Sequence, residues 1–354
     1  MSTRDASYSS VLDDLERGIL HALQIDPRAG FSRIAGALGV SEQTVARRYR
    51  RLRGEGLLRV VGLVDPRSVG QAEWMVRVGC RPGGAGRLAE ALARRDDVAW
   101  VTLTAGGSEI VCSVRSRSAE QRDELLLQRL PATSQVLSMD AYAVLHRFAG
   151  GSSTDWTGYG PALRPDQIEA LLASAPAPGP GAGPDEAGPD EPVTLRPEDR
   201  PLLDELAVDG RASYAALAAA AGSTVGRVTR RLEILRRSGV LYFDLDVASG
   251  LMGFTAPAYL WLTVEPASLA ATGEELAGHP EIAFCAAISG SANLAASILC
   301  RDLEDLYQYV TTKISAVAGL RQLETSVVLR RTKQAGSQMT GQRLAAPSPP
   351  PRGR

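Results

Sequence analysis

The feature that most constrains this chain is an internal repeat at a constant spacing of 183 residues. The string VARR at 45–48 returns as VTRR at 228–231, and residues 12–58 align with 195–241 without a gap. Seventeen of these 47 aligned positions are identical. A repeat this long is a duplicated domain, because solenoid units repeat every ~20–50 residues. The 354-residue chain is therefore expected to hold two copies of one module.

Composition indicates the cellular compartment in which the chain is expected to function. Hydrophobic residues make up 44%, enough for packed cores, and the four cysteines lie in apolar runs without the close spacing of a zinc or redox motif. The first ten residues are polar, unlike a signal peptide, and no run is apolar enough to span a membrane. We expect reduced thiols, a cytoplasmic protein and no membrane partner.

Two segments interrupt the folded pattern. Residues 150–194 include the string APAPGPGAGPDEAGPDEP, which is predicted to be a Pro/Gly/Ala-rich linker. Residues 336–354 are rich in proline and arginine and are predicted to be a disordered tail.

A helix-turn-helix is predicted in each copy, at 10–62 and 195–246. In the first copy, apolar residues at helical spacing mark one helix over 12–23 and a short second helix over 32–38. Gly39 then occupies the turn, and Ser41 is a good N-cap for a third helix with Val45, Tyr49 and Leu52 inward. The second copy repeats this plan around Gly222 and Thr224.

The third helices carry most of the local charge. Residues 41–53 and 224–237 each hold five arginines against one glutamate, a net charge of +4. Either these are solvated helix faces, or they neutralise DNA phosphates and reach base edges in the major groove. We favour double-stranded DNA, because the same excess recurs on the same helix. The predicted DNA-binding residues are Ser41, Gln43, Thr44, Arg47, Arg48, Arg51, Thr224, Arg227, Arg230 and Arg231.

The rest of each copy, at 70–148 and 254–333, alternates short strand and helix patterns in the order β-α-β-β-α-β. This order is that of a ferredoxin-like fold, so the predicted class is α+β, with two winged-helix-like helix-turn-helix domains and two βαββαβ domains. Such a sheet has helices on one face only. We expect its open face to be buried by pairing within or between chains.

The loop before the third strand of each βαββαβ domain is the one segment resembling a ligand site. Glycine there lets backbone amides approach a small carboxylate, and a neighbouring polar side chain could hold an amine. The alternative, which we favour from the residues alone, is a tight strand connection that merely needs glycine. The candidate residues are Gly106, Gly107 and Glu109 in the first copy and Ser289, Gly290, Ser291 and Asn293 in the second. At the 183-residue spacing, Gly107 corresponds to Gly290.

These patterns resemble the leucine-responsive/AsnC (feast/famine) family of bacterial and archaeal transcriptional regulators. The resemblance is carried by AGFSRIAGALGVSEQTVARRYRRLRGEGLL, by RASYAALAAAAGSTVGRVTRRLEILRRSGVL, by the Gly70 and Gly253 segments and by the glycine loops. It implies DNA binding by the helix-turn-helix, self-association of the βαββαβ (RAM) domain, and a small effector, usually an amino acid, near the glycine loop. Typical members carry one copy, so this chain resembles a covalent pseudo-dimer. Because the family often has an acid after the loop glycine, Asn293 and the shifted Glu109 are departures.

An enzyme of the same fold family is the alternative. Siroheme decarboxylases resemble this family and often fuse two such halves, but they use histidines near the tetrapyrrole. Here His21, His146 and His279 are the only histidines, and they do not occupy matching positions. We therefore expect a regulator with no catalytic residues, no metal site and no bound cofactor.

Overall fold

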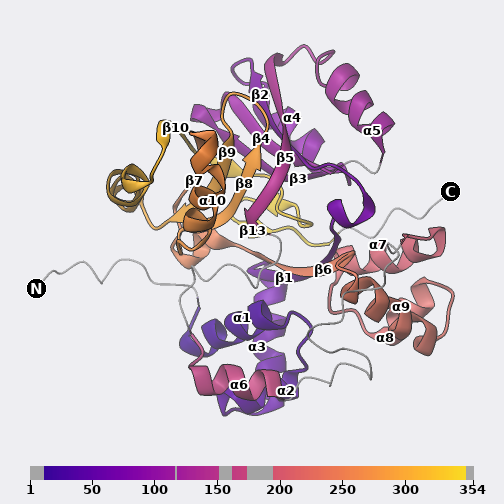
Figure 1. Ribbon diagram of the computed structural model, residues 1–354. Coiled ribbons are helices and arrows are strands. Elements are labelled where there is room, and N and C mark those ends of the chain that lie inside the picture. The colour runs from indigo at the N-terminus through magenta and orange to yellow at the C-terminus, as the bar shows by residue number, and fades with distance from the viewer. Residues whose placement is uncertain (1–11, 116–117, 151–161, 174–193, 348–354) are drawn as a thin grey trace, which may run out of the picture. The chain divides into compact units, whose positions relative to one another are not determined.

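The computed structural model describes residues 12–115, 118–150, 162–173 and 194–347, and it separates into two compact units. Of these described residues, the first unit gathers 71–115, 118–150 and 248–343, and the second gathers 12–70, 162–173, 194–247 and 344–347. Each unit thus takes the same part from both copies of the repeat. Figure 1 colours the chain along its length, so that each unit contains both early and late colours.

The helical unit contains the first predicted helix-turn-helix. Helices α1 (Asp14–Ile25), α2 (Phe31–Leu38) and α3 (Glu42–Gly54) follow one another. Asp13 and Glu16 cap the start of α1 reciprocally, and Gly39 ends α2 in the left-handed conformation, with φ 68°. The inward residues Ile19, Ile34, Val45 and Leu52 are fully buried, as their spacing predicted.

The second copy repeats this arrangement. Helices α7 (Arg200–Val208), α8 (Tyr214–Ala220) and α9 (Val225–Arg237) surround the buried Leu206 and Leu217. Both helix-turn-helix predictions are confirmed.

The two helical copies are joined by a strand from each. Strands β1 (Leu58–Val64) and β6 (Leu241–Val247) pair antiparallel, with Val61 opposite Asp244. These two residues are 183 positions apart and therefore equivalent, so a pseudo-two-fold axis passes between them. The strand that follows the third helix of each copy is thus paired with its counterpart from the other copy.

One helix lies where the sequence predicted only linker. Helix α6 (Pro165–Ala173) packs on α2, with Leu171 fully buried, and the Arg33 guanidinium donates to the Leu171 carbonyl at 2.7 Å. Just before it, the backbone N–H of Leu163 donates to Nδ1 of His21. The prediction of a linker over all of 150–194 is wrong here. A short apolar segment escaped notice because the surrounding residues are dominated by proline and glycine.

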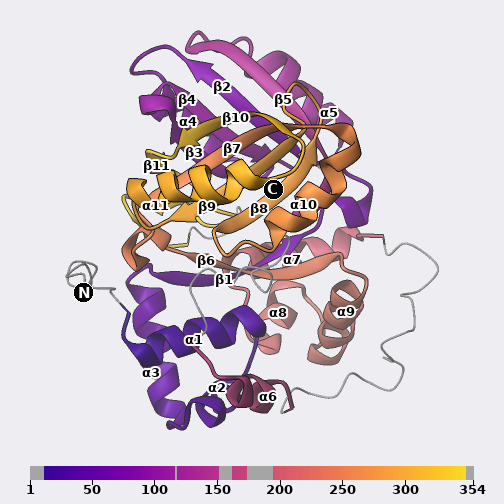
Figure 2. The ribbon, with the colours of Figure 1, turned by 60° about the vertical axis from the view of Figure 1, so that its left-hand side comes forward.

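The other unit holds the two βαββαβ domains. The first contains β2 (Trp74–Cys80), α4 (Ala85–Ala93), β3 (Val98–Thr104), β4 (Glu109–Val114), α5 (Ala119–Asp123) and β5 (Val136–Ala149). The second contains β7 (Ala256–Val264), α10 (Leu269–Ala277), β8 (Ile282–Ile288), β9 (Leu294–Cys300), α11 (Leu303–Gln308) and β10 (Leu320–Val327). Figure 2 shows α10 and α11 over the second set of strands. The α+β class and both βαββαβ domains are confirmed.

The two domains share one nine-stranded sheet, in the order β10-β7-β9-β8-β5-β2-β4-β3-β11. The long β5 pairs with β2 of its own copy and then with β8 of the other copy. Reciprocally, β11 (Arg330–Arg331) follows β10 and pairs with β3. A mixed apolar cluster, which includes Met75, Tyr142, Tyr259 and Trp261, buries the faces left open by the helices. The expected pairing of the domains therefore occurs inside one chain.

The predicted disordered tail also differs from the structure. Strands β12 (Met339–Thr340) and β13 (Arg343–Leu344) form a hairpin within it. Before the hairpin, the carbonyl of Gln334 accepts from the Trp100 N–H at 3.0 Å. The hairpin is local, whereas the Trp100–Gln334 contact joins residues far apart in the sequence, and local composition carried no sign of it. Residues 348–354 lie outside the described part of the chain.

Candidate nucleic-acid interface and glycine loops

The third helices begin at polar caps. The Ser41 hydroxyl accepts from the Thr44 N–H, and the Thr224 hydroxyl accepts from the Arg227 N–H. The side chains of Ser41 and Thr44 also lie 2.9 Å apart and share a hydrogen bond. Three of the residues predicted to touch DNA therefore also fix the start of the helix, where a polar cap contributes about 1 kcal/mol.

The remaining predicted contacts divide into two groups by direction. Gln43 and Arg47 on α3, and Arg227 and Arg230 on α9, are exposed. Arg47 and Arg230 are equivalent positions of the two copies. Each copy thus presents a cationic side chain in the middle of its third helix.

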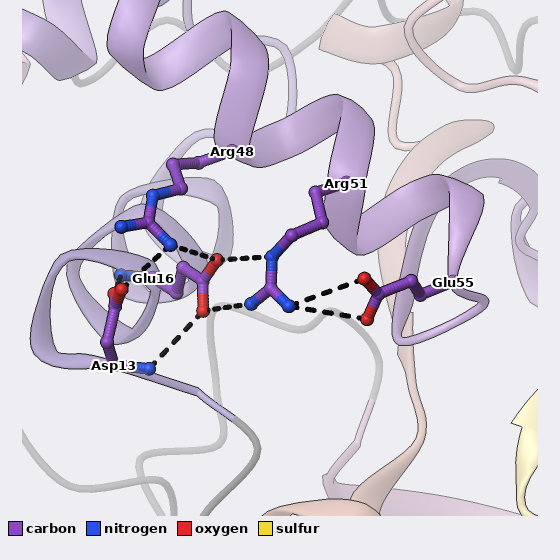
Figure 3. A network of polar contacts seen from close by, with 5 residues as sticks. All are labelled: Asp13, Glu16, Arg48, Arg51 and Glu55. Atoms are coloured by element: carbon purple, nitrogen blue, oxygen red, sulfur yellow. Dashed lines mark hydrogen bonds and ion pairs between the residues drawn. The ribbon is translucent and has the colours of Figure 1, made fainter.

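Two other arginines of α3, Arg48 and Arg51, take part in a network of polar contacts within the domain, as Figure 3 shows. Arg48 and Arg51 both donate to the carboxylate of Glu16, which is buried on α1. Arg51 also pairs with Glu55, one turn further along α3, and the Glu16 hydrogen bond raises the pKa of Arg51. The Arg48 and Arg51 guanidiniums thus neutralise a buried carboxylate. Their contact with DNA stays a prediction.

The same kind of ion pair occurs in the second copy. Arg231 donates from Nε to Asp199 at 2.7 Å, and Asp199 stands at the position equivalent to Glu16. Burial opposes ionisation of Asp199, yet the hydrogen bonds from Arg231 bring its pKa below the ordinary value. Arg231 is therefore ion-paired in the same way as Arg48, and its contact with DNA likewise stays a prediction. A helical-wheel projection that also included the acids of the first helix would have distinguished the exposed arginines from the ion-paired arginines.

Across the pseudo-two-fold axis, one pair of arginines binds each copy to the other. Arg28 donates to the carbonyls of Gly210 and Ala212, and Arg211 donates to those of Pro27 and Ala29. These contacts are reciprocal at the 183-residue spacing. Their role was not predicted from the sequence. The signal was that both copies have arginine at this equivalent position, Arg28 in the first and Arg211 in the second.

The glycine loops are equivalent at a spacing of 184, one residue more than in the helical unit. Val78 lies opposite Ile110 and Leu262 opposite Leu294, so one extra residue precedes β7. The correspondence of Gly107 with Gly290 is thus corrected. Gly106 is the structural counterpart of Gly290, and Glu109 is that of Asn293.

In the first loop the polar residue lies within a charged cluster. Glu109 accepts from Arg77 Nε at 2.8 Å and from the Thr104 hydroxyl at 2.6 Å. Beside it the backbone turns through Gly106 and Gly107, at φ 67° and 87°. A Cβ added at Gly106 would meet no heavy atom within 4 Å, so this side of the loop is open.

The second loop is closed by its own contacts. Asn293 accepts from the Val264 N–H and donates to the Val264 carbonyl, at 2.8 and 2.7 Å. The Ser289 hydroxyl accepts from the Ala143 N–H, and a Cβ at Gly290 would lie 2.5 Å from the Tyr142 ring. Ser291 is exposed, and its carbonyl accepts from Thr263. The polar groups that we expected to hold a ligand at Asn293 are therefore already used by the backbone.

Comparison with known proteins agrees with this geometry. Residues 12–53 and 199–236 match the AsnC-type helix-turn-helix domain, and 257–338 match the Lrp/AsnC ligand binding domain. The HTH-type transcriptional regulator AldR of Mycolicibacterium smegmatis is 30% identical over 146 residues, 40% of this chain and 85% of AldR. An uncharacterized HTH-type transcriptional regulator of Pyrococcus furiosus is 32% identical over 122 residues, 34% of this chain and 82% of that relative. The chain belongs to the Lrp/AsnC family.

This Lrp/AsnC chain also resembles a solved structure along most of its length. The siroheme decarboxylase NirDL superposes with a TM-score of 0.57 at 14% identity, covering 91% of this chain and 93% of that one. At this identity the likeness shows a shared duplicated fold.

The described residues of this family member contain no cluster of metal-ligating side chains and no helix long and apolar enough to cross a membrane. Its four cysteines are buried thiols, and burial raises the pKa of Cys112 and Cys285 to about 12.

One buried ionic cluster in the unit that carries the Lrp/AsnC ligand-binding match was not predicted. Glu73 accepts from the Ser113 hydroxyl and from Arg115 Nε, each at 2.7 Å, and also from Arg147. It precedes β2, whereas its partners come from β4, from the residue after β4 and from β5. Burial alone would raise the pKa of Glu73, but the two arginines and Ser113 lower it to about 2.

Proposed function

We propose that this protein is a sequence-specific DNA-binding transcriptional regulator in which one chain supplies both halves of the DNA-binding dimer. The observation that carries the proposal is the presence of two recognition helices, each with exposed arginines, in one pseudo-symmetric unit. The β1–β6 pairing and the Arg28 and Arg211 contacts connect those helices. The named relatives are helix-turn-helix regulators, which supports the same activity.

The division of the arginines allows a sharp test. Arg47→Ala and Arg230→Ala remove exposed cations, so each should weaken promoter binding and reduce the steepness of its salt dependence, by roughly 0.9 per lost phosphate contact. Melting temperature should hardly change. Arg48→Ala and Arg231→Ala are changes at the neighbouring residues that break buried ion pairs. Their main effect should be a lower melting temperature rather than a change in base preference.

Fluorescence anisotropy with a promoter fragment recovered by genome-wide pull-down, together with thermal melts, measures both effects. The exposed starts of α3 and α9 differ, with Gln43 in one copy where Gly226 stands in the other, so the two half-sites should differ in sequence. Unchanged promoter affinity in the Arg47→Ala/Arg230→Ala double variant would remove the proposal.

We further propose that the effector is a small amino acid, as is usual in the family, and that it binds at the first glycine loop. Support comes from the open space at Gly106 and from the closed contacts of Asn293 in the second loop. Ligand binding should raise the melting temperature by mass action. A thermal-shift screen of the twenty amino acids should find a ligand whose effect is lost in Gly106→Val and kept in Ser291→Ala. The reverse pattern would place the effector at the second loop.

The enzyme alternative has the NirDL fold in its favour. Against it, two of the three histidines of this chain are engaged elsewhere: His21 accepts from the Leu163 N–H, and His279 shares a hydrogen bond with the Tyr309 hydroxyl. The third, His146, is exposed on β5. Incubation with siroheme under reducing conditions, followed by absorption spectra and mass analysis, should leave the tetrapyrrole unchanged. Loss of carbon dioxide from siroheme would establish the enzyme.

A further inference from the structure

A second candidate ligand site lies away from the glycine loops. A groove of about 340 Å³ separates α4 of the first copy from the segment that follows β11 in the second. Glu90 and Arg94 line one wall, and Arg330, Arg331, Gln338 and Thr340 line the other. Its volume lies at the small end of the range for ligand pockets, ~300–1,000 Å³.

The groove carries uncompensated positive charge. Arg94, Arg330 and Arg331 face a single acid, Glu90. Over the described residues, none of the three guanidiniums has a carboxylate within 4.0 Å, whereas Arg77, Arg115 and Arg147 in the same unit are all ion-paired. Within that same described part, the buried Arg331 Nε also has no hydrogen-bond acceptor. Three guanidiniums without a carboxylate partner around one concave surface form a positively charged site that suits an anion.

The wall that supplies two of these arginines is fixed in place. The Trp100 N–H donates to the Gln334 carbonyl at 3.0 Å, and Lys333 Nζ donates to the Arg95 carbonyl at 2.6 Å. The Arg331 guanidinium lies over the Trp100 ring, 5.6 Å from its centre. Trp100 itself has φ 53°, a conformation unusual for a residue with a large side chain. The segment that carries Arg330 and Arg331, and the Arg331 guanidinium itself, are therefore held in position without needing a ligand to order them.

From this geometry we infer that the groove binds a small multiply charged anion that carries carboxylate or phosphate groups. The planar forks of Arg94, Arg330 and Arg331 match either group. A ligand here would contact α4 of one copy and the C-terminal segment of the other. It would therefore strengthen the pairing of the two effector domains and act as a second effector, independent of the amino acid.

Isothermal titration of the full chain with citrate and, separately, with pyrophosphate tests the site and distinguishes the two chemistries. Ionic strength is held constant with sodium chloride. Arg94→Ala and Arg330→Ala should each weaken binding about tenfold or more, as expected for the loss of a charge-assisted hydrogen bond. Arg87→Ala is the control, because Arg87 is exposed on the same helix and does not line the groove. Arg330→Lys keeps the charge without the fork and should be intermediate.

Phosphates could also collect on the recognition helices, so the Arg47→Ala/Arg230→Ala variant is titrated in parallel. It should bind the anion as the unmodified chain does, even where it no longer binds DNA. The inference is overturned if neither anion binds above the chloride background, or if Arg94→Ala and Arg330→Ala bind like the unmodified chain. Loss of anion binding only in the recognition-helix variant would also overturn it, and would leave the proposed function standing.

Discussion

Individual charged residues in this protein differ sharply in what they do, even between neighbours of the same type. Arg47 projects to solvent, while Arg48 is drawn to the buried Glu16 on another helix. The equivalent pair, Arg230 and Arg231, divides in the same way. Only the cations of the first kind remain to be neutralised by a polyanion. Counting the basic residues on a helix therefore overestimates how many of its cations are unpaired.

Glu73 gives a prediction for pH at the same scale. Its pKa falls from an ordinary value near 4.5 to about 2 in the folded state, so its ionised form stabilises the fold above the ordinary value. That stability, on the order of a few kcal/mol, should be lost as the pH falls from about 4.5 towards 2. Glu73→Gln removes the titrating group and leaves Arg147 without its buried partner.

Urea unfolding of the unmodified chain and of Glu73→Gln at a series of pH values measures this. The difference in unfolding free energy between the two should be largest at pH 6 and should narrow below pH 4.5. A difference that stayed constant down to pH 3 would show that the Glu73 carboxylate is not held ionised by its arginines.

Among the elements, α6 offers a matched pair of neighbouring leucines. Leu171 is fully buried against the helical unit, whereas Leu172 is 51% exposed. Leu171→Asp should detach α6 from α2 and lower unfolding stability by about 2–4 kcal/mol, because a buried apolar side chain is lost and a charge would be buried. Leu172→Asp should change stability by less than about 0.5 kcal/mol. Hydrogen exchange should show faster exchange at 165–173 in the first variant only. Equal effects of the two changes would mean that α6 is not docked.

The sequence predicted helices and strands from their periodicity. It did not predict features that depend on contacts between residues distant in sequence. The buried faces marked by Ile19, Val45 and Leu52 could be read from spacing alone, as could the order of the βαββαβ strands. Helix α6 and the β12–β13 hairpin could not, since proline- and glycine-rich surroundings hid both, and α6 docks on residues that are distant in sequence. The direction of Arg48 likewise depends on an acid 32 residues away. At the glycine loops, the one-residue insertion before β7 shifted the correspondence, and only strand pairing revealed it.

At the scale of the whole molecule, the duplication builds a dimer out of one chain. Sequence equivalence predicted two modules, and the structure shows that each unit is completed by strands or helices from both copies. In the helical unit the copies meet at β1 and β6, and in the other unit they meet at β5 with β8 and at β3 with β11. Neither copy can bury its own open sheet face, because Met75 and Tyr142 pack against Tyr259 and Trp261.

This arrangement predicts that the covalent connection between the copies is not what holds them together. A protease site inserted between residues 176 and 190 allows the chain to be cut after folding. The two halves should remain associated on gel filtration in 1 M salt, because their contacts are mainly apolar packing and backbone hydrogen bonds, which salt does not screen. DNA affinity of the cut protein should be close to that of the intact chain at concentrations above the dissociation constant of the halves. Separation of the halves in native buffer would show that the paired strands are too weak to maintain the dimer, and that tethering is essential to bring two recognition helices to one operator.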